Sequence, residues 1–433
     1  MHTEVFVAGG GVGGLALAVK LASRGVHVTV AEQLDKTSPL YKGELLQPKT
    51  INILDSLGVL SDVHEYGNKI EDLEFQEVIR HSSGWLEEIS NTKLTYNRLA
   101  GDFDYALMIP HDRIKAILKE KGEQFPEYFH YLAGARFLGF ENGKAAIKWN
   151  KDKKFVEADV YVGAEGRSSP TREAMGVSVN RTDYNHHFLT VTIPRPDDFI
   201  EGKIVTTNRC LLGMFPLPDN EVRTVYLIKA GEYKQIKEKG LEYVYRAYGS
   251  LEPRLKEHVK AIKEWKKIQL MIPYTYHVDK YVTGNIALIG DAAHTVHPMA
   301  GEGMNLAIQD ADVLGELVAW CKETGRHYHE YLADYEQVRR PHVEFLLKLS
   351  HLSAIVYSYP YEWWRRLRMK AVERMCEDDK LHEKQMLNIS GLGKWDFSIV
   401  DRAIQAGAFP ARKQTITDTQ QLNHHFQDYP WKK

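Results

Sequence analysis

The hydrophobic pattern begins with two short apolar runs on either side of an apolar helical segment. Residues 4–8 and 26–31 are largely apolar over the length of a short strand, which is typical of buried strands. Residues 13–24 between them have the composition and length of a helix, and Gly25 marks the break before the second run. We therefore predict that the first 35 residues form a strand, loop, helix and strand.

Further along the chain, strand-like and helical patterns alternate. From about 180 to 275, the alternation of apolar and polar residues indicates an antiparallel sheet, with a helical stretch at 231–265 inside it. Residues 130–163 and 285–290 favour strands. The other predicted helices cover residues 48–57, 106–122 and 303–322, and most of the chain beyond Pro341.

These segments predict an α/β protein with two interleaved domains and no internal repeat. The first is a Rossmann-like dinucleotide-binding domain made of residues 1–75, 100–180 and 280–340. The second is an antiparallel-sheet substrate domain made of residues 76–99 and 181–279. Residues 341–433 are expected to form a C-terminal helical region.

Composition narrows the class of protein without deciding its function. The 433 residues carry a formal net charge of −2, so a basic face for nucleic acid is not indicated. Three scattered cysteines form neither a metal-binding nor a disulfide pattern, and we expect no metal and a cytoplasmic location. No apolar run reaches the length of about 18 residues that a membrane span needs.

A glycine motif lies where the first predicted strand meets the first helix. Gly9, Gly11 and Gly14 form the pattern G-x-G-x-x-G, whose glycines permit a tight turn, the approach of a pyrophosphate and close helix packing. The helix N-terminus adds a positive dipole end for phosphate. Glu32, at the end of the second strand, can accept hydrogen bonds from ribose hydroxyls. The predicted site for FAD or NAD comprises Gly9, Gly11, Val12, Gly13, Gly14, Glu32 and Gln33.

A second motif, NIALIGDAAHTVHPMAGEGMN, covers residues 285–305. Asp291 follows a buried strand and can accept a hydrogen bond from a sugar-like polyol; its alternative role is that of a helix cap. The glycine-rich loop can lie flat against a ring beside a helix N-terminus, which stabilises negative charge. These features favour FAD over NAD, with predicted contacts from Asp291, Pro298, Gly301 and Gly303.

A third motif, ADVYVGAEGRSSPTR, covers residues 158–172. With the other two, it resembles the single-component FAD-dependent aromatic hydroxylases, which include the 4-hydroxybenzoate and ubiquinone hydroxylases. In that family the third motif, DxxxGADGxxSxxR, contacts both FAD and the nicotinamide donor. The resemblance extends from residue 1 to about 340 and implies further cofactor contacts from Gly290, Met304 and Asn305 in the second motif. In the third motif it implies contacts from Glu165 and Gly166, although Glu165 stands where the family usually has Asp.

Three basic positions also fit the family pattern. Lys42 lies where an arginine is common near the pyrophosphate, and a lysine supplies the charge without the bidentate fork. His111 and Arg113 lie where the family often has a flavin-phosphate contact. The resemblance implies that these residues bind the cofactor, and the alternative for each is a solvated surface charge.

The resemblance implies an NAD(P)H-dependent FAD monooxygenase that uses O2 to hydroxylate an aromatic or quinone-like molecule through a flavin C4a-hydroperoxide. Such chemistry needs a dry apolar pocket, with the sheet at about 180–275 as one wall. Pro298 and His297 are the expected catalytic positions, and a monomer or homodimer is expected. Other candidate polar groups of the pocket are His186, His187, Arg209, Tyr226 and Tyr274.

Other flavin chemistries remain open at this point. A flavin-dependent halogenase shares the fold, but its W-x-W-x-I-P signature is absent around Trp265. A flavin-dependent reductase of a prenyl-type or other unsaturated substrate is a further alternative, as is a non-catalytic flavoprotein.

The segment YEWWRRLRMK at residues 361–370 combines aromatic and basic side chains. Such a helix can lie on a membrane surface. More often it packs its aromatic side chains inward and exposes its arginines to solvent, and we predict this second arrangement.

Overall fold

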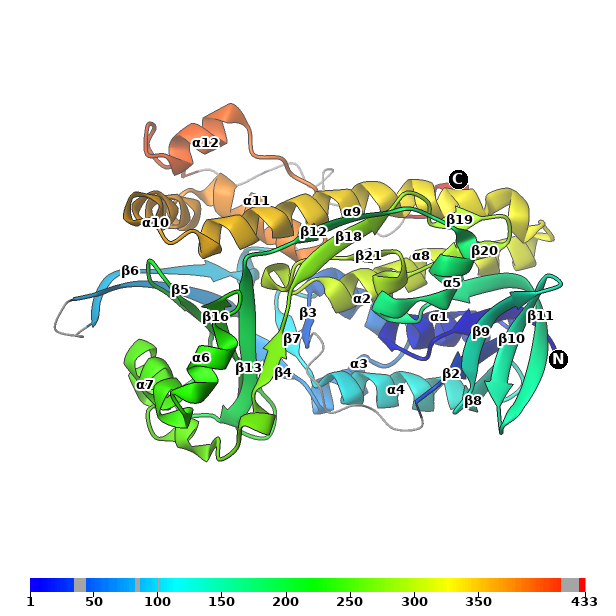
Figure 1. Ribbon diagram of the computed structural model, residues 1–433. Coiled ribbons are helices and arrows are strands. Elements are labelled where there is room, and N and C mark those ends of the chain that lie inside the picture. The colour runs from blue at the N-terminus through cyan, green and yellow to red at the C-terminus, as the bar shows by residue number, and fades with distance from the viewer. Residues whose placement is uncertain (35–43, 82–85, 100, 414–427, 433) are drawn as a thin grey trace.

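The computed structural model describes residues 1–34, 44–81, 86–99, 101–413 and 428–432. Figure 1 shows two main sheets at opposite sides of the molecule, with long C-terminal helices lying across the top of both. The structure is therefore an α/β arrangement in which segments far apart in the sequence build each sheet, as the hydrophobic pattern predicts.

The first sheet contains the glycine motif. Its parallel strands are β8 (Phe129–Ala133), β2 (Val28–Glu32), β1 (His2–Ala8), β11 (Asp152–Gly163) and β20 (Ile286–Leu288), in that order. A hairpin of β9 (Arg136–Glu141) and β10 (Lys144–Trp149) pairs with β11, and β19 (Val282–Thr283) closes the far edge. The predicted strand–helix–strand unit at the N-terminus is confirmed as β1, α1 (Val12–Ser23) and β2.

The second sheet gathers strands from two distant parts of the chain. Its order is β17 (Gln269–Met271), β13 (His186–Pro194), β16 (Glu221–Lys229), β15 (Leu211–Leu217), β14 (Gly202–Thr206), β5 (Asp72–Arg80) and β6 (Leu86–Thr95). All its neighbours are antiparallel except β14 and β5, which run parallel. The predicted helical stretch at 231–265 contains α6 (Tyr233–Glu238) and α7 (Leu241–Leu251).

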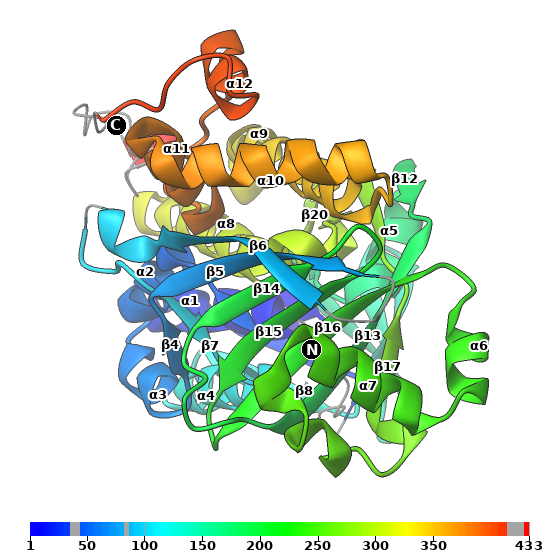
Figure 2. The same cartoon turned by 90° about the vertical axis from the view of Figure 1, so that its left-hand side faces the viewer.

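The two faces of the second sheet bury different partners. In β15, Leu212 and Met214 point into a core shared with α7, whereas Leu211, Gly213 and Phe215 line a cavity on the opposite face. This alternation follows from the two-residue period of a strand. The cavity face is covered by the C-terminal helices, which cross above β5 and β6 in Figure 2.

The C-terminal helices are α9 (Tyr328–Ser358), α10 (Glu362–Glu377), α11 (Asp379–Ser390) and α12 (Ile399–Gln405). Pro341, where the sequence predicts the helical region to begin, lies inside α9 and does not end it. A proline removes one backbone hydrogen bond, and α9 offsets that loss by packing on α8 (Gly303–Thr324). No helix in the described part of the chain is long and apolar enough to cross a membrane.

Two small sheets join these parts. One comprises β3 (Leu45–Leu46), β7 (Ala106–Met108) and β4 (Asn68–Ile70), and the other comprises β12 (Val179–Asp183), β18 (Tyr274–Val278) and β21 (His294–Thr295). Strand β21 lies in the second sequence motif and pairs with β18, which pairs with β12. Because β12 precedes β13 and β18 follows β17 in the chain, this small sheet connects the motif to the second sheet.

Candidate active site

The glycine loop between β1 and α1 has the shape of a phosphate cradle. Gly9 has a φ of +105°, and a Cβ there would overlap the Ala164 carbonyl. A Cβ on Gly14 would overlap the carbonyl oxygen of Gly9. A Cβ on Gly11 would meet only the Ala164 oxygen, at 4.0 Å. The first turn of α1 has no side-chain cap, so its N–H groups are available to a phosphate.

Glu32 closes the far side of this loop. Its carboxylate accepts hydrogen bonds from the backbone N–H groups of Gly10 and Leu34, both at 2.9 Å. Gln33 beside it is exposed. Val12 and Gly13 are buried in the first turn of α1. Lys42, the predicted pyrophosphate contact, lies outside the described residues.

The second motif is held by a buried carboxylate that sequence reasoning missed. Asp310 accepts hydrogen bonds from the Gly290 N–H at 2.8 Å and from Arg339 Nε at 2.7 Å, and it pairs with His294 Nε2 at 2.7 Å. Gly290 takes a φ of +57° in this turn. A signal was present, because Asp310 lies in a helix whose neighbours Leu306, Ile308 and Ala311 are apolar and fully buried.

The second and third motifs contact each other directly. Asp291 forms an ion pair of 3.5 Å with Arg167, and both side chains are more than a third exposed. Arg172 donates to the carbonyl of Ala292 at 3.1 Å and to the hydroxyl of Tyr276 at 3.0 Å. The two loops are thus fixed against each other beside the first sheet.

Glu165 forms hydrogen bonds within the third motif, and its contact with the cofactor stays a prediction. Its carboxylate accepts hydrogen bonds from the hydroxyls of Ser169 at 2.7 Å and Thr171 at 2.5 Å, and from the Thr171 N–H at 3.1 Å. Burial raises its pKa, against these hydrogen bonds. In this structure Glu165 therefore stabilises the start of α5 (Pro170–Met175), while Gly166 next to it has a φ of +77°.

The start of α8 presents an open backbone. A Cβ on Gly303 would meet nothing within 4 Å, and Gly301 has a φ of +67°. Asn305 braces the loop: its amide oxygen accepts from the Gln47 N–H at 2.8 Å, and its amide nitrogen donates to the carbonyls of Leu45 and Gly301, both at 3.0 Å. Met304, the residue before Asn305, is buried.

Glu302 in the same loop is buried, and neither carboxylate oxygen has a hydrogen-bond partner in the described part of the chain. Burial raises its pKa well above the usual range. A buried carboxylate without a partner is costly, because the charged form loses its hydration. Burial therefore favours the neutral form of the Glu302 carboxyl beside the positive end of α8.

His111 and Arg113 lie in the first turn of α4 (His111–Glu123). Arg113 is exposed and its guanidinium carbon is 5.1 Å from the ring centre of Tyr66. His111 is half-buried. Their role in binding a cofactor phosphate stays a prediction.

A cavity of about 640 Å³ lies between the second sheet and the C-terminal helices. Its walls are mainly apolar and include Leu73 and Phe75 from β5, Phe215 from β15 and Val372 from α10. Pro298, Met299 and Gly301 of the second motif line it as well. Leu352 and Leu367, which line the cavity, are also 40% and 49% exposed, so it opens to solvent between α9 and α10.

All six polar residues predicted for the pocket lie outside the cavity lining that the structure describes. His186, His187, Arg209, Tyr226, Tyr274 and His297 are not among the described residues that line the cavity. Tyr226 is buried on the α7 side of the sheet, and Arg209 is exposed on the loop after β14. The polar lining residues include Glu44, Gln47, Tyr357, Arg368, Gln385 and Arg402.

His297 forms part of a buried aromatic cluster directly before Pro298. Its Nε2 lies 2.9 Å from Nε2 of His186, and its Nδ1 accepts from the Met299 N–H at 3.3 Å. In the neutral ring the proton is therefore on Nε2, which donates to His186. Burial, and then the neighbouring His186, lower the pKa of His297 to about 3. His297 is therefore a neutral hydrogen-bonding group at neutral pH.

An ion pair joins the cofactor side to the second sheet. Arg223 of β16 donates to both carboxylate oxygens of Glu44, at 2.9 and 2.7 Å. Glu44 is 4% exposed and lies directly before β3. Because both nitrogen–oxygen contacts form at once, this ion pair fixes the position of β16 in the second sheet relative to the segment before β3, at the edge of the cavity.

These loops fit a dinucleotide. Glycines 9, 11 and 14 leave room beside the N-terminus of α1, and the positive-φ turns at Gly290 and Gly301 lead to the open N-terminus of α8. A model of the FAD binding domain family matches residues 2–350. The chain belongs to this family. The bound dinucleotide is FAD, as the second and third motifs predict.

Characterised relatives are similar over most of the chain. The 6-methylpretetramide 4-monooxygenase of Streptomyces rimosus is 28% identical over 72% of this chain and 73% of its own length. The ubiquinone hydroxylase UbiL of Rhodospirillum rubrum is 26% identical over 90% of each chain. The 3-demethoxyubiquinol 3-hydroxylase of Escherichia coli is 24% identical over 86% of this chain and 95% of its own.

Solved structures share the fold. PqsL of Pseudomonas aeruginosa, in complex with 2-aminobenzoylacetate, superposes with a TM-score of 0.74 at 23% identity, covering 86% of this chain and all of PqsL. The p-nitrophenol 4-monooxygenase PnpA of Pseudomonas putida superposes with a TM-score of 0.75 at 19% identity, covering 90% of this chain and 98% of PnpA. These structures show the fold, while the family match and the sequence relatives identify the chain as an FAD-dependent monooxygenase.

Proposed function

We propose that this FAD-dependent monooxygenase hydroxylates an aromatic or quinone-like molecule bound in the cavity above the Pro298–Gly301 loop, with NAD(P)H as electron donor. The observation that carries the proposal is that one apolar cavity borders both this loop and the second sheet. Relatives named as hydroxylases of a pretetramide, a ubiquinone and a demethoxyubiquinol support the substrate class.

The size and lining of the cavity favour a substrate with more than one ring or a bulky apolar substituent. Ligand pockets for small molecules commonly enclose 300–1,000 Å³, and this cavity of about 640 Å³ lies well within that range. Its apolar walls exclude water around a bound ring. Phe75, Phe188 and Phe215 supply flat surfaces against which a ring can pack.

Each loop has a separate task in this proposal. Gly9, Gly11 and Gly14 hold the pyrophosphate at the start of α1, and Glu32 binds the ribose. Asp291 binds the ribityl chain, and the N–H groups at the start of α8 stabilise negative charge on the ring. FAD supplies the redox chemistry that activates O2. Pro298 limits the cavity where ring and substrate meet, and His297 holds the loop in place through His186 and the Met299 N–H.

Oxygen consumption by the purified FAD-loaded protein tests the proposal. With NADH or NADPH and a panel of phenols, quinolones and aromatic polyketides, at least one compound should raise O2 uptake, and its product should contain one oxygen atom from labelled O2. Product formation without O2 would support a reductase instead. If no compound raised O2 uptake above the rate without substrate, the proposal would lose its basis.

A further inference from the structure

The wall of the cavity that α10 forms contains a buried arginine. Arg368 lines the cavity and is 4% exposed. Two other charged residues line it in the described part of the chain: Glu44 is paired with Arg223, and Arg402 is exposed on α12. Arg368 is therefore the buried cation of this wall, and its neighbours Leu367 and Val372 are apolar.

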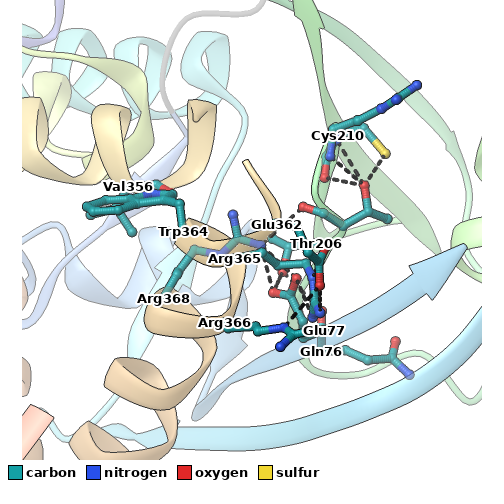
Figure 3. A network of polar contacts seen from close by, with 12 residues as sticks. Gln76, Glu77, Thr206, Cys210, Val356, Glu362, Trp364, Arg365, Arg366 and Arg368 are labelled. Atoms are coloured by element: carbon teal, nitrogen blue, oxygen red, sulfur yellow. Dashed lines mark hydrogen bonds and ion pairs between the residues drawn. The ribbon is translucent and has the colours of Figure 1, made fainter. Parts of the chain in front are cut away.

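Arg368 is held by a network around one carboxylate, which Figure 3 shows from close by. Its Nη2 donates to both oxygens of Glu77, at 2.7 and 2.8 Å, and to the Thr207 carbonyl at 3.1 Å. Thr206 donates its hydroxyl to the same carboxylate at 2.5 Å. These contacts fix the position of the guanidinium and occupy only one of its nitrogen atoms.

The network contains more positive than negative charge. Arg365, one turn earlier on α10, is 3% exposed and places Nη1 3.8 Å from Glu77 Oε1, so two guanidiniums approach one buried carboxylate. Arg365 also pairs with Glu362, which is about half exposed and shared with Arg366. Since solvent screens Glu362, the buried part of the network retains positive charge.

Unused donors remain in this network. The Nε of Arg368 and the Nη1 of Arg365 are buried without a hydrogen-bond partner in the described part of the chain. A buried donor left unpaired is unfavourable, and more so when it carries charge. An anionic ligand oxygen that entered the cavity beside Arg368 would compensate the excess positive charge of this network.

We propose that Arg368 is a specificity-determining residue that binds an anionic oxygen, such as a phenolate or enolate, on an otherwise apolar ring system in the cavity. This rests on the proposed function, because it takes the cavity to be the substrate site. Among aromatic molecules that fit the cavity, the Arg368 guanidinium selects those that carry one acidic oxygen. Glu77 acts as the positioning residue that holds the guanidinium toward the cavity.

Two fluorescent probes with the same ring skeleton test the proposal on the FAD-loaded protein. 8-Anilinonaphthalene-1-sulfonate carries one anionic group, and N-phenyl-1-naphthylamine lacks it. In Arg368→Met, we expect the sulfonate probe to bind at least about tenfold more weakly, while the dissociation constant of the uncharged probe changes less than about twofold. Equal weakening of both probes, or no change for the sulfonate, would overturn the proposal.

Further variants separate a binding role from a structural one. Arg366→Met removes an exposed arginine of the same helix, and neither probe should respond. Glu77→Gln removes the counter-charge but keeps an amide oxygen that can accept from Arg368, so it should tighten the sulfonate probe, whereas a merely loosened wall would weaken both probes. Should Arg368→Met fail to fold, Arg368→Gln removes the positive charge but keeps an amide that can donate to Glu77. It should still weaken the sulfonate probe selectively, and unchanged binding there contradicts the proposal.

Because probe binding needs neither NAD(P)H nor O2, its outcome is independent of turnover. Selective loss of the sulfonate probe together with absent O2 uptake would support the arginine site and reject the monooxygenase proposal. Normal O2 uptake with unselective probe binding would do the reverse.

Discussion

Two buried ion-pair networks of this protein differ in how their charges are balanced. In the first, Asp310 faces one arginine, Arg339, and its oxygens also meet the Gly290 N–H and His294. In the second, Glu77 faces two arginines, Arg365 and Arg368. Unpaired guanidinium nitrogens occur in both networks, Arg339 Nη2 among them, so the networks differ in the ratio of arginine to carboxylate. The Asp310 network lies between α8, α9 and the second motif, away from the cavity lining, whereas Arg368 of the Glu77 network lies in that lining.

The difference separates a structural site from a binding site. A balanced pair that holds a turn has no need of a ligand, and removing either partner leaves a charge buried in the protein. An unbalanced network beside a cavity can take up an oxygen from outside. We therefore expect the Asp310 network to govern folding and cofactor retention, and the Glu77 network to govern ligand choice.

The largest effect is expected from Asp310→Ala. It leaves Arg339, which is fully buried, without its carboxylate and frees the Gly290 turn, so the free energy of unfolding should fall by about 3–5 kcal/mol. Urea unfolding and the FAD content of the purified protein measure this. Leu314→Met, in the same helix, is the matched control and should retain the stability and the FAD content of the wild type. If Asp310→Ala retained them as well, the Asp310 network would not have the structural role assigned to it.

Arg368→Met should cost less stability than Asp310→Ala. Glu77 keeps the Thr206 hydroxyl and the nearby Arg365, so a loss of about 1–3 kcal/mol is expected from the weakened network. The FAD content should stay that of the wild type, because the hydrogen-bond partners of Arg368, which are Glu77 and Thr207, lie outside the three cofactor motifs. Loss of FAD from this variant would show that the two networks are not separate in function.

Stability should depend on pH through the histidines of the Pro298 loop. The pKa of His297 is lowered by burial to about 3 and that of His186 to about 4, below the unfolded value of about 6.5. Below that value the unfolded chain binds more protons, so stability is full above about pH 6.5 and falls as the pH decreases. His297 contributes about 1.4 kcal/mol per pH unit. Urea unfolding between pH 5 and 7.5 should show a smaller slope in His297→Gln, and equal slopes would contradict this.

The smallest effect is expected from Arg366→Met. Its side chain is 73% exposed and pairs with Glu362 at 3.4 Å in solvent, so the free energy of unfolding should change by less than about 0.5 kcal/mol. Thermal unfolding measures it beside Arg368→Met. A similar loss in both variants would mean that burial does not distinguish the two arginines.

The cofactor loops were predictable from sequence because their geometry is local. A turn that only glycine tolerates, as at Gly9 and Gly290, must have glycine at that position whatever surrounds it. The strands before the glycine loop and before the second motif, and the helices after both, were equally visible in the apolar pattern. The short helix α5 after the third motif was not predicted. Asp310 and Arg339 were missed because they act between helices rather than within one motif.

The wall at α10 could not be predicted, and the expectation for residues 361–370 was only partly right. Trp364 lines the cavity and Arg366 is exposed, as predicted. Trp363 is 60% exposed, whereas Arg365 and Arg368 are buried. Helical periodicity alone favours the reverse. The arginines turn inward because Glu77 meets them, and Glu77 lies almost three hundred residues earlier in the chain. Only the pairing of β5 with β14 and the crossing of α10 above them bring these residues together.

The central claim is that bound FAD and the ligand of the apolar cavity meet at the Pro298–Gly301 loop. Titration of the FAD-loaded protein with N-phenyl-1-naphthylamine, followed by flavin absorbance and probe fluorescence together, tests it most directly. We predict that flavin absorbance and probe fluorescence change with one dissociation constant. Ala371→Trp, which fills the cavity, should abolish both changes. Probe fluorescence that saturates while the flavin spectrum stays unchanged would contradict it.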